Sequence, residues 1–220
     1  MSDEINWEPQ QVADLGVRLS RIGSEYRTTI ADMYNEVNSI GVNQLWVGRN
    51  YNVVVAGIFN RTMGLFEEWS NYMQLIVPQT VCGIAETQKS SSGVIDYSLT
   101  NVEVEIKRVE ETEDKGDGSQ KLNPSEVRNI INNSLPGYNT KVSEIVSNYL
   151  TQFEELSTIQ HNNAIKDMSN ELNEILVKTR NLIEQFSQEA TEAVEKSIQN
   201  VEITDEETRQ MAARIATIVG

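Results

Sequence analysis

Residue types that could carry out chemistry are few in this chain. It has one cysteine, Cys82, and one histidine, His161, and no sequence pattern brings this thiol and imidazole together. Glu171 and Glu174 are three residues apart, but neither belongs to the Glu-x-x-His motif of a di-iron site in a helical bundle. No Gly-x-Ser-x-Gly, phosphate-binding loop or dinucleotide-binding motif is present. We therefore expect that the protein is not an enzyme and binds no cofactor or metal.

The lone cysteine and histidine have simpler interpretations. Cys82 cannot form an intrachain disulfide, and its helix-like surroundings favour a small apolar core residue. An intermolecular disulfide is the alternative. His161 lies in the polar run Gln160-His161-Asn162-Asn163, which is typical of a turn.

The charge balance excludes several classes of partner. Eighteen basic and thirty-three acidic residues give a net charge of −15, whereas phosphate binding requires a basic face. We expect no nucleic-acid partner and a solvated acidic surface. No apolar run is long enough to span a bilayer, and no basic amphipathic face is evident, so membrane binding is not expected. The N-terminus lacks the pattern of a Sec signal peptide, which predicts either a cytoplasmic protein or export by a route that accepts leaderless cargo.

The first ninety residues have the periodicity of two amphipathic helices. Residues 8–42 and 52–77 are predicted as helices because their apolar residues step by three and four, and residues 43–51 are predicted as a turn. Pro78 is expected to bend or end the second helix. Small residues lie among the core positions of the first helix, at Gly16, Ser20 and Gly23, and two interpretations are open. They permit close approach of a partner helix, or they are tolerated defects.

Residues 94–121 differ in kind from their neighbours. Apolar and polar residues largely alternate between residues 97 and 106, which is typical of a strand, and residues 110–118 read as a flexible acidic linker. A lone strand is not stable. Residues 99–109 are therefore expected to pair as an edge strand, to form a short hairpin, or to be helical instead.

The second half of the chain is again predicted as helical. A helix begins at Asn123-Pro124, and Leu135-Pro136-Gly137 is expected to interrupt it. After a further helix to about residue 158, a long apolar row runs from Ile165 to Ile198. Thr204 is predicted as the N-cap of a separate final helix.

The two halves of the chain share one plan. Segments 8–88 and 123–200 each have a proline near the start, a helix, a polar turn and a longer helix. A shift of 113 residues places Phe59 on Leu172 and Trp69 on Leu182, although identity is low. Because a single hairpin exposes an apolar seam, each hairpin must be covered. The second hairpin covers the first within one chain, or two chains self-associate through the first hairpin.

One motif indicates a family. Trp46-Val47-Gly48 lies between the two long predicted helices of the first hairpin. A Trp-x-Gly at the joint of such a hairpin resembles the WXG100 (ESAT-6-like) family of small secreted bacterial proteins, and the chain resembles a fused tandem of two such hairpins. The glycine permits a backbone geometry that a side chain would strain. The tryptophan plugs the open end of the hairpin or presents an aromatic surface to a partner.

The resemblance implies both an architecture and a function. It implies an antiparallel four-helix arrangement and a role as a substrate or accessory of a type VII (ESX/Ess-like) secretion system, acting through protein–protein recognition. Its partner would be the secretion ATPase or a partner cargo protein, and Trp46 and Gly48 would belong to the recognition site. The family's C-terminal Tyr-x-x-x-Asp/Glu signal occurs at none of the seven tyrosines. The last helix, with Met211 and Ile215, is a docking candidate by position.

Together these observations predict an all-α protein. We expect two long helical hairpins forming a four-helix-bundle-like rod, with a short β segment in the linker. The predicted parts are residues 1–93 as the WXG100-like hairpin, 94–121 as the acidic linker, and 122–220 as the second hairpin with the C-terminal helix. The alternative function is a cytoplasmic helical adaptor or chaperone that binds a toxin or cargo partner. The expected location is outside the cell by the type VII route, or the cytoplasm before export.

Overall fold

The computed structural model describes residues 8–89, 93–116, 120–159 and 163–219, with the backbone alone described for 201–219. The protein is mostly helical, with one two-stranded sheet of two residues per strand, so the all-α prediction is confirmed. The elements in chain order are α1 Pro9–Val42, β1 Trp46–Val47, α2 Arg49–Tyr51, η1 Asn52–Ala56, α3 Gly57–Asn71, η2 Tyr72–Ile76, α4 Val77–Gln88, β2 Lys121–Leu122, α5 Pro124–Asn129, η3 Ile130–Ser134, α6 Leu135–Ile159 and α7 Asn163–Val219.

The first hairpin consists of α1 and a second limb, residues 49–88, in which α2, η1, α3, η2 and α4 follow one another without a break. Pro78 does not end this limb, which continues to Gln88, so of the two expectations, a bend or an end, the end is wrong at this position. The π-helical turn η2 precedes the proline, and the Val77 N–H bonds to the Tyr72 carbonyl, five residues back. This shift in register carries the helix past a residue that has no N–H to donate.

Two carbonyls lose their helical donors at this site, and distant hydroxyls replace them. The Tyr149 hydroxyl donates to the Met73 carbonyl at 2.8 Å, and the Ser20 hydroxyl donates to the Gln74 carbonyl at 3.1 Å. Both hydrogen bonds are buried. The π turn is therefore stable because α1 and α6 each supply a hydroxyl to it.

The two limbs of the first hairpin come unusually close at glycines. A Cβ built on Gly23 would lie 2.5 Å from the carbonyl carbon and oxygen of Met73, and one on Gly16 would lie 2.5 Å from the Cys82 sulfur. Of the two interpretations of these small residues, close approach of a partner helix is confirmed. The partner is the hairpin's own second limb.

The second hairpin is also more continuous than its sequence predicts. Pro136 lies inside the helical run and again follows a π turn, η3, in which the Leu135 N–H bonds to the Ile130 carbonyl. The expected interruption at residues 135–137 is therefore wrong. Thr204 lies within α7 and does not begin a separate helix, so the N-cap prediction is also wrong. The polar run at residues 160–162 lies outside the described residues.

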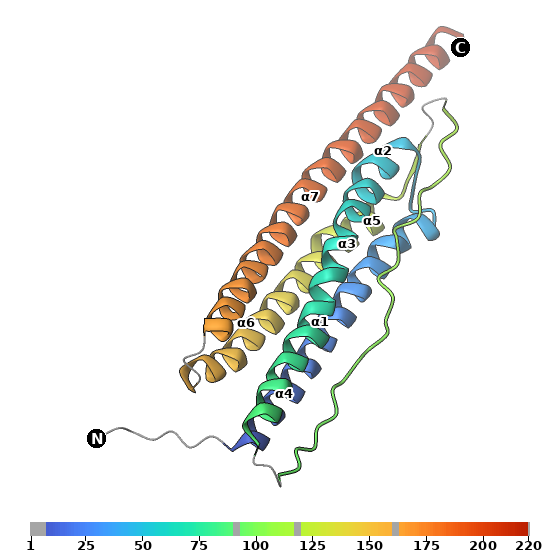
Figure 1. The fold of residues 1–220 in the computed structure, drawn as a ribbon. Helices are drawn as coiled ribbons and strands as arrows, with labels where there is room; N and C mark the ends of the chain where they lie inside the picture. The colour runs from blue at the N-terminus through green and yellow to red at the C-terminus, as the bar shows by residue number, and fades with distance from the viewer. Residues whose placement is uncertain (1–7, 90–92, 117–119, 160–162, 220) are drawn as a thin grey trace.

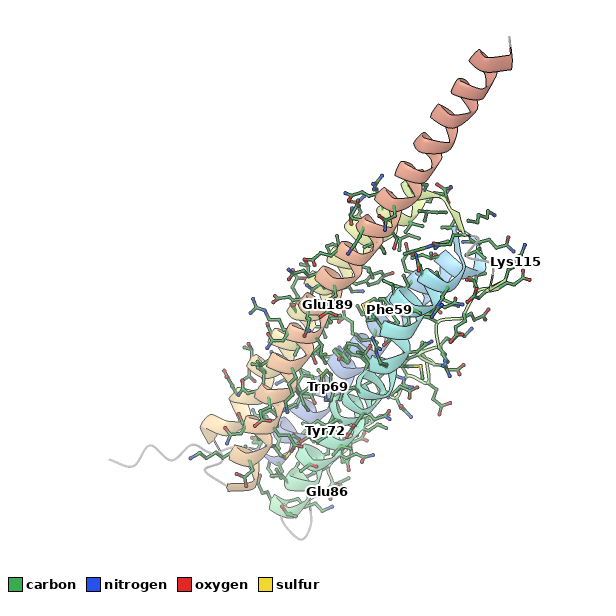
Figure 2. The ribbon with its side chains drawn as sticks, turned by 90° about the horizontal axis from the view of Figure 1, so that it is seen from above. Phe59, Trp69, Tyr72, Glu86, Lys115 and Glu189 are labelled. Carbon is green, nitrogen blue, oxygen red and sulfur yellow. The ribbon has the colours of Figure 1, made fainter. Side chains whose placement is uncertain are left out.

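The two hairpins pack side by side (Figure 1). The end of α1 lies at one end of the molecule, and the end of α6 and the start of α7 lie at the other (Figure 1). Inter-hairpin contacts include the Tyr149–Met73 hydrogen bond, a hydrogen bond of 2.9 Å from the Tyr72 hydroxyl to Glu171, and an ion pair of 3.4 Å between Arg18 and Glu155. The α7 helix runs past the end of the other helices (Figures 1 and 2).

A long crossover joins the hairpins. Residues 93–116, named the strap from here on, run in extended form along the first hairpin, from the end of α4 back toward the hairpin turn (Figure 1). Glu86 and Lys115, near the two ends of this path, lie toward opposite ends of the second limb (Figure 2). The described strap belongs to no strand, so residues 99–109 form neither an edge strand, nor a hairpin, nor a helix. The short sheet lies elsewhere, where Trp46 pairs with Leu122 and Val47 with Lys121.

The core takes buried residues from both hairpins and is rich in aromatic residues. Tyr34 makes edge contacts with Phe59 and Phe66, at ring-centroid distances of 5.4 and 6.2 Å. Phe59, Trp69 and Tyr72 follow one another along the second limb (Figure 2). The largest fully buried side chains are those of Trp46, Tyr26, Tyr34, Tyr51, Tyr149, Phe59, Phe153, Leu15, Leu19, Ile30, Ile40 and Met73.

Candidate functional site

Trp46, the first residue of the motif at the hairpin turn, is fully buried, with 0% of its surface exposed. Its ring makes an edge contact with Tyr51 at a centroid distance of 6.1 Å, and its backbone pairs with Leu122. The indole Nε1 has no hydrogen-bond partner among the described residues. Of the two roles considered for this tryptophan, burial favours the plug at the end of the hairpin over an aromatic surface offered to a partner.

Gly48 has a backbone conformation that requires glycine. Its φ is 118° and its ψ is −178°, a combination that a side chain would strain. It is the N-cap of α2, and its N–H donates a hydrogen bond of 2.9 Å to the Thr112 hydroxyl. Gly48 therefore starts the second limb and at the same time contacts the strap.

Asn52 fixes the strap beside this turn. Its Nδ2 donates to the Thr112 carbonyl at 2.8 Å, and its Oδ1 accepts from the Thr112 N–H at 2.8 Å. The strap continues the contact upstream, where the Glu110 N–H donates to the Asn38 side chain at 2.8 Å. The segment at residues 110–112, predicted as part of a flexible linker, is bound to the hairpin tip.

Two apolar side chains are exposed at the tip of the first hairpin, which is the turn between α1 and the second limb. Val42 is 58% exposed at the end of α1, and Val53 is 61% exposed at the start of the second limb. A cavity of about 550 Å³ opens between the turn and the strap. It is lined by turn residues together with glutamates and lysines of both flanking segments, namely Gly41, Val42, Gln44, Val47, Glu110, Glu111, Thr112, Glu113, Lys115, Gln120 and Lys121. Carboxylates and ammonium groups face the same space, so the cavity does not carry one sign of charge.

The candidates for chemistry are not assembled into a site. Cys82 is buried, its thiol lies 3.7 Å from the Ala13 carbonyl, and burial raises the pKa of the thiol to about 11, so the reactive thiolate is disfavoured at neutral pH. The Glu171 carboxylate accepts a hydrogen bond from the Tyr72 hydroxyl, and Glu174 forms an ion pair of 3.1 Å with Lys178 on the surface of α7. His161 lies outside the described residues. In the described parts of the chain no three His, Cys, Asp or Glu side chains gather as a metal site requires.

The second predicted recognition element is described only in outline. Met211 and Ile215 lie in the last turns of α7, and their side chains are outside the described set. They are not brought close to Trp46 and Gly48 by any described contact. Their role stays a prediction.

Sequence reasoning missed the residues that hold the strap. Three carboxamides, of Gln10, Asn52 and Asn60, each bond to both polar groups of one strap residue, and Arg27 donates to the Val104 carbonyl at 2.7 Å. Isolated Asn and Gln residues on a helix carry no sequence signal for such contacts. Only the strand-like alternation of the strap itself indicated that this segment is extended.

No protein-family model, curated protein or solved structure matches this chain. Among the described helices, none combines the length and the apolar composition that crossing a bilayer requires. The function is therefore argued from the sequence motif and the geometry alone.

Proposed function

We propose that this chain is a WXG100-like substrate or accessory of a bacterial type VII (ESX/Ess-like) secretion system. It acts through protein–protein recognition, and its partner is the secretion ATPase or a partner cargo protein. On this proposal it is cytoplasmic before export and then leaves the cell by the type VII route. The observation that carries the proposal is the Trp46-Val47-Gly48 turn, which joins two long helices of opposite direction.

The geometry of this turn supports a structural role for the motif. Trp46 is buried and Gly48 has a positive φ, so both residues fix the shape of the tip. The partner then contacts the exposed residues that the motif positions, above all Val42 and Val53. Both apolar side chains are more than half exposed, so a partner that binds at the turn can reach them.

The second hairpin covers the apolar seam of the first, and this favours a role as secretion cargo over a role as an adaptor. An adaptor that binds a toxin through an apolar seam needs that seam to be free. In this chain α6 packs on α1, and the Tyr149–Met73 hydrogen bond is buried between the hairpins. A chain that supplies its own second hairpin is already a paired, folded unit and needs no separate partner to cover its core.

The test is an export assay in the producing bacterium. Cells and culture supernatant are blotted for the chain with the type VII ATPase present and deleted. The variant Val42→Glu/Val53→Glu changes the exposed tip and leaves the buried motif intact. The matched control is Val177→Glu, because Val177 is 58% exposed but lies on α7.

We expect ATPase-dependent export of the wild type and the control, and loss of export for the tip variant with normal helicity. Retention of the wild type in cells under both conditions would contradict the proposal and favour the adaptor. Equal export of both variants would show that the tip is not the contact surface.

A further inference from the structure

The strap is held mainly through its main chain. Asn60 donates to the Val109 carbonyl at 3.0 Å and accepts from the Val109 N–H at 2.9 Å. Gln10 does the same with Asp96, at 2.8 and 3.3 Å, and Asn52 with Thr112. A carboxamide that bonds to both polar groups of one residue reproduces what a neighbouring β-strand offers to an extended chain.

The other polar contacts follow the same rule. The Ser20 hydroxyl shares its one proton between the Gln74 carbonyl at 3.1 Å and the Thr100 carbonyl at 2.6 Å. The Ser24 hydroxyl donates to the Thr100 carbonyl at 3.1 Å, and the Arg27 Nε donates to the Val104 carbonyl. Asn38 accepts the Glu110 N–H. The strap groove is defined here as the helix residues that make these contacts, namely Gln10, Ser20, Ser24, Arg27, Asn38, Asn52 and Asn60. These side chains bond to the main chain of an extended segment, so most of their hydrogen bonds do not depend on the sequence of that segment.

Two strap side chains are fully buried and are named the anchors, while Ile95 and Val104 pack against the core in part-buried positions and the Thr112 hydroxyl contacts Gly48 and Asn52. Ile106 is 2% exposed and Val109 is 1% exposed, whereas every other described strap residue is exposed or half-buried. An extended segment with two apolar residues three positions apart therefore reproduces the fully buried side-chain contacts of the strap. Several exposed strap residues, Glu103 and Glu105 among them, add negative charge to a chain whose net charge is already −15.

We propose that the strap groove is a binding site for an extended segment of a partner protein, and that the strap is a resident occupant that exchanges with it. The partner segment presents a free main chain and two apolar residues spaced as Ile106 and Val109, and it carries neutral or basic residues elsewhere. Such a segment keeps all the main-chain hydrogen bonds and relieves self-repulsion. Because the strap is tethered, its effective concentration is roughly millimolar, so the groove stays closed to weak competitors.

The experiment releases the strap without altering the groove. In the full-length variant Ile106→Asp/Val109→Asp the two anchors are lost, while every groove residue is retained. The probe is a fluorescent peptide with the wild-type sequence of residues 99–113. A matched probe carries an N-methyl group at the position of Val109 and cannot donate to Asn60. Hydrogen exchange of the strap amides and circular dichroism report release and folding.

We expect the released variant to bind the probe at least about tenfold more tightly than the wild type does. The N-methylated probe should bind about tenfold more weakly than the parent probe, because the part-buried Asn60 oxygen loses its donor. Adding Asn60→Ala to the released variant should reduce binding similarly.

Three results would overturn the proposal. If the released variant loses its helices, the strap is part of the core and not an exchangeable occupant. If its strap amides stay protected, the two anchors do not hold the strap. The third result is a released strap with no binding of the probe, or with equal binding of the N-methylated probe. The groove then does not bind the main chain of a second molecule.

Discussion

The two hairpins follow one plan but are built differently. In the first, α1 and the second limb meet at Gly16 and Gly23, and tyrosine, phenylalanine and tryptophan side chains fill the space between them. In the second, α7 offers a narrow apolar stripe and surface ion pairs such as Arg180–Glu184 at 3.1 Å. The first hairpin thus fixes the shape of the molecule, and the second covers its open seam.

The two proline sites show this difference in detail. Both Pro78 and Pro136 follow a π turn of five residues. At Pro78 the freed carbonyls are buried and accept hydroxyls from α1 and α6. At Pro136 the equivalent carbonyls belong to Ile131, a buried residue, and Asn132, an exposed one. At Pro78 this π turn therefore also joins the second limb to α1 and α6 through the two hydroxyls.

The largest expected effect comes from high pH, because buried tyrosines lie mostly in the first hairpin. Burial raises the pKa of Tyr26, Tyr34 and Tyr149 well above the ordinary value, and that of Tyr51 to about 12. Their stabilisation is fully present below the unfolded-state pKa of about 10 and is lost as pH rises from there toward the folded-state pKa. At about pH 11 each lowers the free energy of unfolding by about 1 kcal/mol.

Urea unfolding at neutral and alkaline pH measures this loss. Tyr26→Phe and Tyr34→Phe should flatten the alkaline dependence, because phenylalanine does not ionise. Tyrosinate absorbance follows the ionisation directly. If all tyrosines ionise near pH 10 while the helicity stays complete, the tyrosines of the first hairpin are not buried, and the account is contradicted.

The next largest effect is expected at the close approach of the two limbs. Gly23→Ala should lower the free energy of unfolding by about 3 kcal/mol, because the new Cβ meets the Met73 backbone. Gly83→Ala and Gly137→Ala are the controls, since nothing lies within 4 Å of the added Cβ. Each should stabilise its helix by up to about 1 kcal/mol. A neutral Gly23→Ala would mean that the limbs are farther apart than described.

Breaking the buried contact between hairpins should have a smaller effect. Tyr149→Phe leaves the Met73 carbonyl without its donor and should cost about 2 kcal/mol in chemical unfolding. Tyr138→Phe, a half-buried tyrosine on the same helix, should cost far less. If both variants lose the same free energy of unfolding, the Tyr149 hydroxyl does not stabilise the contact between α6 and the π turn.

The smallest effect is expected within the second hairpin. Arg128 pairs with Glu195 at 3.1 Å and lowers the pKa of that carboxyl. Both side chains are about one-third exposed, so Arg128→Ala should cost less than about 1 kcal/mol at neutral pH. Because the pKa is depressed, the stabilisation is present above the ordinary range of a glutamate and is lost as pH falls through the folded-state pKa. Urea unfolding at pH 7 and at about pH 3 should show the difference disappear, and a difference that persists would contradict the assignment.

The sequence was sufficient to predict the helical class and the outline of the hairpins. Apolar residues at steps of three and four predicted α1 closely, and Gly23 among them indicated a close approach. A helix end at Pro78 and an interruption at residues 135–137 were predicted wrongly. A π turn accepts Pro78 because hydroxyls far away in the sequence, from Ser20 and Tyr149, replace the lost donors. Such compensation depends on tertiary contacts and leaves no local pattern.

The candidate site was less predictable than the fold. Trp46 and Gly48 were found from their motif, but the burial of the indole follows from the β1–β2 pairing with Leu122, which no sequence spacing indicates. The strap was identified as unusual by its alternation. Its binding by Asn60 and the other carboxamides depends on residues from separate helices and could not be predicted.

The central claim is that one chain supplies both hairpins of the bundle. The most direct test is the molar mass of the purified full-length chain by sedimentation equilibrium over a wide concentration range. The account predicts a single species of 24.8 kDa at every concentration. A stable species of twice that mass, persisting on dilution, would contradict it, because the seam of the first hairpin would then be covered by a second molecule.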